Sequence, residues 1–143
     1  MKPEEVPFIS EFSKITFDKL RYNDTDRQGH VNNTVFSSLF ETGRVEVLYN
    51  TNNPVVDNNC SFVIASMKVD YLFEITWPGE VKIGTRVKKI GNSSIQFFQG
   101  LFQNEKCVAC AETIIVQMNE TTRKSSPLSK NCIDVLQELL YKK

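Results

Sequence analysis

The order of apolar and polar positions divides the chain into one long helical stretch and several strand-sized ones. From about Asn33 to Tyr49, apolar side chains recur every three or four residues, which is the period of an α-helix. Four later stretches have the length of strands and are separated by turn sequences; they cover residues 61–73, 80–90, 94–103 and 106–119. Their connections are too short for parallel crossovers, so the pattern predicts an α+β protein in which these four strands form an antiparallel meander.

Both ends of the chain carry further elements. Ile15 and Phe17, with polar residues around them, predict a first strand ahead of the helix, whereas residues 1–10 predict a polar N-terminal tail. Residues 127–143 predict a C-terminal helix whose apolar face is made by Ile133, Leu136 and Leu140. Because 143 residues suffice for one hydrophobic core, we expect residues 1–143 to form a single domain.

The long helix is expected to lie inside the protein. It carries more large apolar side chains than a surface helix does, so the sheet should wrap around it; they are Val35, Phe36, Leu39, Phe40 and Val47. A glycine in its middle, Gly43, costs about 1 kcal/mol of helix stability relative to alanine. A close contact between helix and sheet at this point would explain the glycine.

Charge and length exclude some classes of protein. Lys plus Arg and Asp plus Glu each number 17, and this zero net charge argues against non-specific binding of nucleic acid. The longest apolar runs are strand-sized, so no membrane span is expected. The first five residues contain two acids where a signal peptide has basic residues, so we expect the protein to be cytoplasmic.

Two of the four cysteines, Cys107 and Cys110, form a C-x-x-C sequence that is typical of zinc and redox sites. The surrounding stretch, however, is expected to be a strand, and residues three apart on a regular strand face opposite sides. No second C-x-x-C and no nearby histidine complete a zinc site. We therefore interpret these cysteines as buried thiols and expect no metal site.

The ten residues from Asp24 to Asn33 contain two aspartates, a glycine, two asparagines and the only histidine of the chain. Asp-x-Asp-x-x-Gly resembles the start of a calcium-binding EF-hand loop, but the twelfth position, where that loop needs a glutamate, is Val35. Asp, Gly and Asn also form ordinary turns, so a purely structural loop is one interpretation.

Catalysis is the other interpretation of this loop. The first turn of a helix presents unpaired backbone N–H groups and a partial positive charge, which can polarise a carbonyl group. A carboxylate just ahead of the helix can attack that carbonyl or activate a water molecule. Gly29 would let the backbone approach a substrate, and His30 could donate a hydrogen bond or orient water. This combination favours the transfer of an acyl group to water.

Residues 21–48 resemble the hotdog-fold thioesterases of the 4-hydroxybenzoyl-CoA thioesterase-like family. The shared features, in order, are an aromatic residue, Asp-x-Asp, Gly, His-Val-Asn-Asn, an aromatic residue and Glu-x-x-Arg within the helix. The His-Val-Asn-Asn sequence is also similar to that of plant acyl-ACP thioesterases. Looser similarity extends the match to about residues 12–119. The resemblance implies a hotdog fold, in which a curved five-stranded antiparallel sheet wraps a central helix, and a homodimer or homotetramer with active sites between subunits.

By position, the resemblance assigns the main catalytic role to Asp26, as nucleophile or general base, and a structural role to Asp24. The backbone N–H of Asn33 matches the group that polarises the thioester carbonyl. His30 matches a residue that functions in the acyl-ACP branch. Glu41, about two turns into the helix, could position water in the partner subunit's site, although it could equally pair with Arg44.

Four more residues are expected to contact substrate. They lie in the loop and at the start of the helix, and they are Gly29, Val31, Asn32 and Phe36. One departure from the family concerns the carrier, because the basic cluster that contacts CoA phosphates in some members is missing at residues 91–93. Lys68, Arg86, Lys88 and Lys89 are the remaining basic candidates.

The resemblance therefore implies a thioesterase that hydrolyses an acyl-CoA without a cofactor. The apolar helix favours a fatty or aromatic acyl group, and hence a place in fatty acid metabolism. Three alternatives stay open at this stage: an acyl-ACP thioesterase, a non-catalytic hotdog module that binds acyl thioesters, and a hotdog dehydratase. The Asp-x-Asp spacing fits the dehydratase least well.

Overall fold

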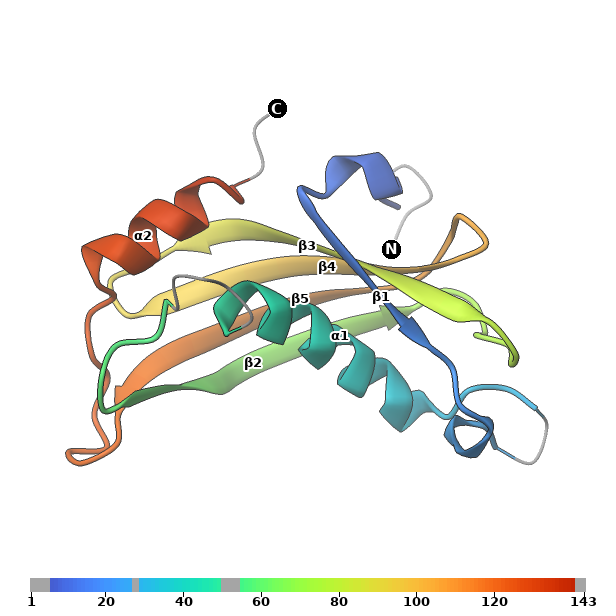
Figure 1. Ribbon diagram of the computed structural model, residues 1–143, viewed down its shortest axis with the longest axis horizontal. Helices are drawn as coiled ribbons and strands as arrows, with labels where there is room; N and C mark the ends of the chain where they lie inside the picture. The colour runs from blue at the N-terminus through green and yellow to red at the C-terminus, as the bar shows by residue number, and fades with distance from the viewer. Residues whose placement is uncertain (1–5, 27–28, 50–54, 141–143) are drawn as a thin grey trace.

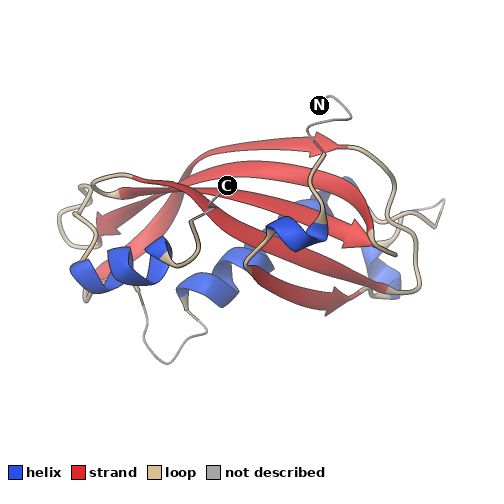
Figure 2. Ribbon diagram, turned by 90° about the horizontal axis from the view of Figure 1, so that it is seen from above, coloured by secondary structure: helices blue, strands red, loops and turns tan. Residues whose placement is uncertain are grey.

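A computed structural model describes residues 6–26, 29–49 and 55–140 (Figure 1). One helix, α1, lies along one face of a curved five-stranded antiparallel sheet, and the curvature is clearest in Figure 2. The strands are β1 (Lys14–Lys19), β2 (Cys60–Tyr71), β3 (Glu80–Ile90), β4 (Ser94–Gln103) and β5 (Lys106–Asn119). The helices are α1 (Asn33–Leu48) and α2 (Lys130–Gln137), with short 3-10 turns η2 (Ile9–Glu11) and η3 (Tyr22–Asp24). This arrangement confirms the expected hotdog fold.

One side of the central helix is buried, for the reason that its sequence suggested. Its apolar side packs on the inner face of the sheet, where Phe36, Leu39 and Phe40 are at most 4% exposed. A Cβ atom on Gly43 would lie only 2.6 Å from the side chains of Gln99 and Ile83. The close helix-to-sheet contact expected at Gly43 is therefore confirmed.

The order of strands in the sheet is β1-β3-β4-β5-β2, which corrects the expected meander. Strands β3, β4 and β5 do follow one another as hairpins, but β2 pairs with β5 rather than with β3. Residues 72–79 therefore cross three strand spacings, about 14 Å, at one end of the sheet. Eight residues can span that distance. The short connection between β2 and β3 therefore did not require these two strands to be neighbours in the sheet.

The C-x-x-C sequence lies in β5, where the expectation of opposite-facing cysteines is wrong. The register shifts between two neighbouring pairs, since Leu101 pairs with Ala109 but Phe102 pairs with Cys107. Val108 is the extra residue of this β-bulge, and bulges change the side to which side chains point. As a result the sulfur atoms of Cys107 and Cys110 lie 3.5 Å apart.

The core has two clusters on the α1 side of the sheet and a third around Phe12. The third cluster contains Phe12, Phe98, Phe102, Cys107 and Cys110, with Val6, Ile9 and Leu72 packed against it. Part of the expected polar tail, residues 6–10, thus packs on the protein, while residues 1–5 lie outside the described residues. The expected C-terminal helix of residues 127–143 is shorter in the structure, where α2 covers Lys130–Gln137 with Ser129 as its N-cap. Leu136 is buried, as expected, and Ile133 and Leu140 pack beside it, although Leu140 lies beyond the helix; residues 141–143 are outside the described part of the chain. No helix in the described ranges is long and apolar enough to cross a membrane.

Candidate active site

The loop between η3 and α1 is held by hydrogen bonds within itself. Thr25 and Val31 form an isolated antiparallel bridge, and the Asn32 N–H donates to the carbonyl of Asp24 at 2.8 Å. Within that bridge, the Asp26 N–H donates to the carbonyl of His30 at 2.8 Å. These bonds hold the two ends of the loop together next to the N-terminus of α1.

The two aspartates of the loop have different surroundings. Asp24 is 8% exposed, and its carboxylate accepts the Arg21 N–H at 2.8 Å and lies 3.6 Å from the Arg21 guanidinium. Through these contacts Asp24, the last residue of η3, caps the start of that turn. Asp26 is exposed, and its Oδ1 accepts the His30 N–H at 3.3 Å. Of the two carboxylates, Asp26 is therefore the one that a substrate can reach.

Gly29 allows the loop to turn. Its φ is +79°, in the left-handed region that glycine adopts without strain, and a Cβ atom there would meet nothing within 4 Å. Its N–H donates to the carbonyl of Asp26 at 3.3 Å. The glycine is needed for the backbone conformation that presents Asp26, and the space beside it is open.

The helix starts next to the loop. Asn32 is the N-cap of α1, and its side-chain oxygen accepts the Thr34 N–H at 3.0 Å and the Thr34 hydroxyl at 3.1 Å. Asn33 is the first helical residue and is exposed. The helix itself supplies no acceptor for its first N–H groups, and the carbonyl-polarising role of the Asn33 N–H stays a prediction.

His30 is held by residues of the connection between β2 and β3, which the sequence pattern did not reveal. Its Nε2 lies 3.0 Å from Oε2 of Glu74, and its backbone forms an antiparallel bridge with Thr76. Thr76 in turn has its N–H and carbonyl bound by the side chain of Gln103, at 3.0 and 2.8 Å. Glu74 and Gln103 are far from the loop in sequence. Their position beside it could be recognised only once the order of the strands in the sheet was known.

Two of the residues expected to contact substrate are buried in this chain. Val31 is 4% exposed and donates its N–H to the carbonyl of Ile75, whereas Phe36 is 3% exposed and packs edge-to-face on Tyr71 at 5.2 Å. Both belong to the core cluster around the start of α1. Their contribution to substrate binding stays a prediction.

Glu41 lies on α1 away from the loop. It is eight residues after Asn33, which is about 12 Å along a helix axis. It borders a small hollow of about 130 Å³ between α1 and the sheet, whose apolar lining is Val45, Leu48, Phe62, Ile64 and Ile115. Arg44, at the same hollow, is buried and donates to Gln99 at 3.3 Å. Burial lowers the pKa of Arg44, and the charge of Glu41 offsets part of that effect.

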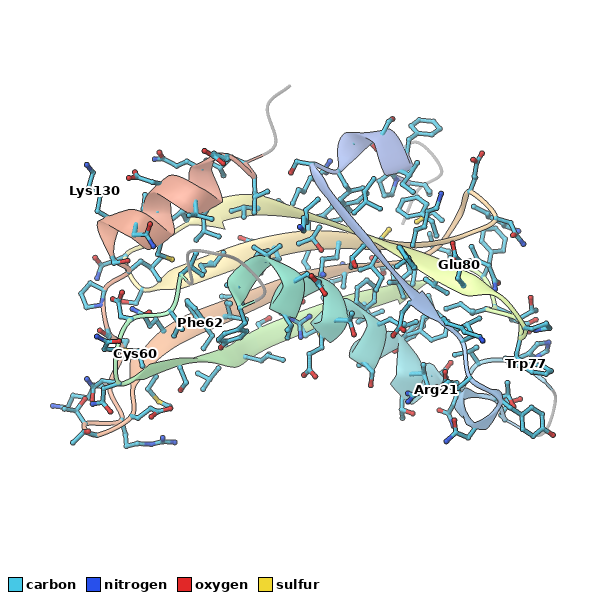
Figure 3. All side chains as sticks on the ribbon, viewed as in Figure 1. Arg21, Cys60, Phe62, Trp77, Glu80 and Lys130 are labelled. Atoms are coloured by element: carbon cyan, nitrogen blue, oxygen red, sulfur yellow. The ribbon has the colours of Figure 1, made fainter. Side chains whose placement is uncertain are left out.

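Aromatic side chains border the loop at the end of the molecule where α1 begins. Tyr22 and Trp77 meet edge-to-face with ring centroids 5.2 Å apart, and both are exposed. Figure 3 labels Trp77 at this end, together with Arg21, whereas Phe62 lies toward the other end of α1. The candidate site therefore has an exposed carboxylate, a helix N-terminus and an aromatic rim.

Comparison with known proteins supports this interpretation. The thioesterase-like superfamily matches residues 20–140. YsmA of Bacillus subtilis, an uncharacterised protein, is 26% identical over 119 residues, which cover 82% of this chain and 78% of YsmA. Among solved structures, a predicted thioesterase from Bacillus stearothermophilus is 27% identical with a TM-score of 0.82, covering 90% of this chain and 97% of that one. A Thermus thermophilus thioesterase complexed with coenzyme A and Zn is 27% identical with a TM-score of 0.76, covering 88% and 98%.

The chain belongs to the thioesterase-like superfamily, because the family match covers most of its length. This confirms the resemblance drawn from residues 21–48. Membership and the thioesterase neighbours together support thioester hydrolysis as the general activity.

Proposed function

We propose that this protein hydrolyses an acyl-CoA to a free acid and coenzyme A, with Asp26 as nucleophile or general base. The observation that carries the proposal is the position of one exposed carboxylate, Asp26, on a closed loop that leads directly into the N-terminus of α1. The backbone N–H of Asn33 would polarise the thioester carbonyl, whose oxygen gains negative charge as the bond to the nucleophile forms.

The reaction needs water, the thioester and a group that handles one proton. In the general-base version, Asp26 takes a proton from water as the oxygen attacks the carbonyl carbon. The C–S bond then breaks, and the thiolate leaves with a proton returned from the carboxyl group. In the nucleophile version, Asp26 first forms an anhydride with the acyl group, which water then hydrolyses. His30 is proposed to hydrogen-bond the substrate or the water.

Coenzyme A is the proposed carrier because a thioesterase of similar structure was obtained with coenzyme A. A cavity of about 390 Å³ borders Thr76, but its lining has one lysine, Lys82, against two glutamates, Glu80 and Glu105. This excess of negative charge does not favour binding of the phosphate groups of coenzyme A in that cavity. Arg86 packs over Phe12 and Phe98 on the sheet face opposite α1, away from the loop. A fatty or aromatic acyl group, and a place in fatty acid metabolism, remain part of the proposal.

A second copy of the chain is proposed to complete the site. β2 is an edge strand of twelve residues, and its side chains Val63 and Ile64 are 38% and 52% exposed. Long apolar edges of this kind tend to pair with another strand. Pairing of two β2 edges would form a homodimer, or part of a homotetramer, in which Glu41 could serve the partner's loop. A cytoplasmic location also stays a proposal.

The test is release of free thiol from a panel of substrates by the wild type and by Asp26→Asn. The panel contains short, long and aromatic acyl-CoAs and an acyl group carried on acyl carrier protein. Hydrolysis of one acyl-CoA class by the wild type, with loss in the variant, supports the proposal. Hydrolysis of the carrier-protein substrate alone favours the acyl-ACP alternative. If no substrate is hydrolysed while acyl thioesters bind, the chain is a binding module.

A further inference from the structure

The two cysteines of β5 form a thiol pair on the sheet face opposite α1. Their sulfur atoms are 3.5 Å apart because the bulge at Val108 turns Cys107 to the side of Cys110. Val108 and Ala109 both join the core cluster on the α1 side, whereas the two cysteines join the cluster around Phe12. A bulge near the start of β5 has therefore brought together two thiols that a regular strand would separate.

The pair lies under a cover of apolar side chains. Cys107 is 6% exposed and Cys110 is 1% exposed. Phe12, which follows η2, packs over the neighbouring strands, where Cβ atoms on Gly84 and Gly100 would meet its ring at 2.5 and 3.1 Å. The thiols are thus shielded by the N-terminal segment, and neither contacts the loop that carries Asp26.

The contact between the two thiols shifts their pKa values in opposite directions. The hydrogen bond from the Cys110 thiol lowers the pKa of Cys107, while the same bond and burial raise the pKa of Cys110. The charge of Arg86 acts in the opposite direction on Cys110. One sulfur thus becomes a thiolate more readily and the other keeps its proton, which is the division of roles found in reactive C-x-x-C pairs.

We propose that Cys107 and Cys110 are a modification site, at which a peroxide converts the dithiol to an intrachain disulfide. The Cys107 thiol gives up its proton, its thiolate attacks one peroxide oxygen and the O–O bond breaks; the leaving hydroxide takes up that proton, so the products are a sulfenic acid on Cys107 and one water molecule. The Cys110 sulfur then attacks the Cys107 sulfur, an S–S bond forms, and the hydroxyl leaves with the Cys110 proton as a second water. Two thiols are oxidised and one peroxide is reduced.

The site is independent of the proposed hydrolysis, and its test needs no substrate. Trypsin cleaves after Lys106 and next after Arg123, so one peptide, residues 107–123, contains both cysteines and no others. The folded full-length protein is treated with hydrogen peroxide, alkylated and digested without reduction. We expect peptide 107–123 to lose the mass of two hydrogen atoms and to escape alkylation. A peptide that stays alkylated at both cysteines, or that gains oxygen on each separately, overturns the proposal.

Single substitutions distinguish the two roles. In Cys110→Ala, the sulfenic acid on Cys107 has no resolving thiol, so it should accumulate and react with dimedone. In Cys107→Ala, the remaining Cys110 should react several times more slowly with peroxide. The matched control is Cys132→Ala, which removes another buried thiol and should leave peptide 107–123 oxidising as in the wild type. Equal dimedone labelling of the two single variants contradicts the assigned order.

Discussion

Asp26 and His30 hold each other by two hydrogen bonds across the turn of the loop. The Asp26 N–H donates to the His30 carbonyl at 2.8 Å, and the His30 N–H donates to Oδ1 of Asp26 at 3.3 Å. The first bond fixes the backbone of the loop, and the second fixes the direction of the carboxylate. A carboxylate held by its own loop can act with little reorganisation, which is the condition for efficient catalysis.

Gln103 helps to hold this loop in place through its hydrogen bonds to Thr76. Replacing Gln103 should therefore make the site more mobile. Gln103→Leu keeps the size of the side chain but leaves the N–H and carbonyl of Thr76 without their partner. We expect the free energy of unfolding to fall by about 1–2 kcal/mol and the amide of Thr76 to exchange faster with solvent. Hydrogen exchange read by NMR checks this. Gln96→Leu, on the same strand, is the control; identical exchange in both variants would show that Gln103 does not hold the loop.

Replacing Gly43 should destabilise the protein, although glycine is an unfavourable residue inside a helix. Alanine would gain about 1 kcal/mol of helix propensity, but its Cβ would lie 2.6 Å from Gln99 and Ile83. Gln99 cannot easily move, since its Nε2 donates to the Phe40 carbonyl at 2.9 Å and to Thr85 at 3.0 Å. Overpacking of this kind costs about 1–3 kcal/mol. Urea unfolding of Gly43→Ala should therefore show a net loss of stability, whereas Ser37→Ala, exposed on the same helix, should show none. A more stable Gly43→Ala would contradict the packing argument.

The stability of the protein should depend on Cys132 above pH 9. Burial, with a smaller effect of Asp57, raises the pKa of Cys132 to about 11 from 9.0. The folded chain then retains a proton that the unfolded chain releases, so this contribution is complete below pH 9 and is lost as the pH rises through 11. Its slope reaches about 1.1 kcal/mol per pH unit near pH 10, where the two states differ by about 0.8 of a proton.

The check is urea unfolding of the wild type and Cys132→Ala between pH 8 and 11. The wild type should lose stability more steeply than the variant over this range, whatever the fixed cost of the lost side chain. Parallel profiles for the two proteins would mean that the thiol is not held protonated by the fold. Cys60→Ala, at a less buried cysteine, serves as the control and should follow the wild type.

The proposed assembly through β2 can be tested at the edges of the sheet. Ile64→Lys places a charge in the apolar part of the β2 edge, which should prevent pairing with a second copy. Light scattering should then report a monomer, and hydrolysis should fall if Glu41 of one copy serves the loop of the other. Phe17→Lys makes the same change on β1, the opposite edge, where Phe17 is 67% exposed, and should leave the assembly intact. An unchanged dimer in Ile64→Lys would place the interface elsewhere.

Local features of the sequence predicted much of this fold. The three- and four-residue spacing predicted α1 to within a residue of its observed ends, and the N-cap, Asn32, is of a residue type that favours this position. Asn104 and Glu105, which separate two of the predicted strands, have φ of +52° and +65°, as a tight hairpin turn requires. Each of these features depends on residues that are neighbours in the chain.

Features that depend on distant residues were missed. The place of β2 beside β5 follows from pairing across some fifty residues, about which the spacing of apolar positions says nothing. The same holds for Glu74, which reaches His30 only because residues 72–79 cross the end of the sheet. The cysteine pair was missed because strict alternation along β5 does not anticipate a bulge.

The central claim is that Asp26 performs the chemistry and Asp24 does not, and one pair of variants tests it most directly. Asp26→Asn and Asp24→Asn make the same change two residues apart. We would measure kcat for free-thiol release from the best acyl-CoA substrate at a temperature where both variants are folded. Asp26→Asn should lose at least about 100-fold in kcat with little change in stability. Asp24→Asn should lose about 1–2 kcal/mol of stability and keep most of its rate. Full activity in Asp26→Asn, or equal losses in the two variants, would contradict the assignment of the catalytic carboxylate.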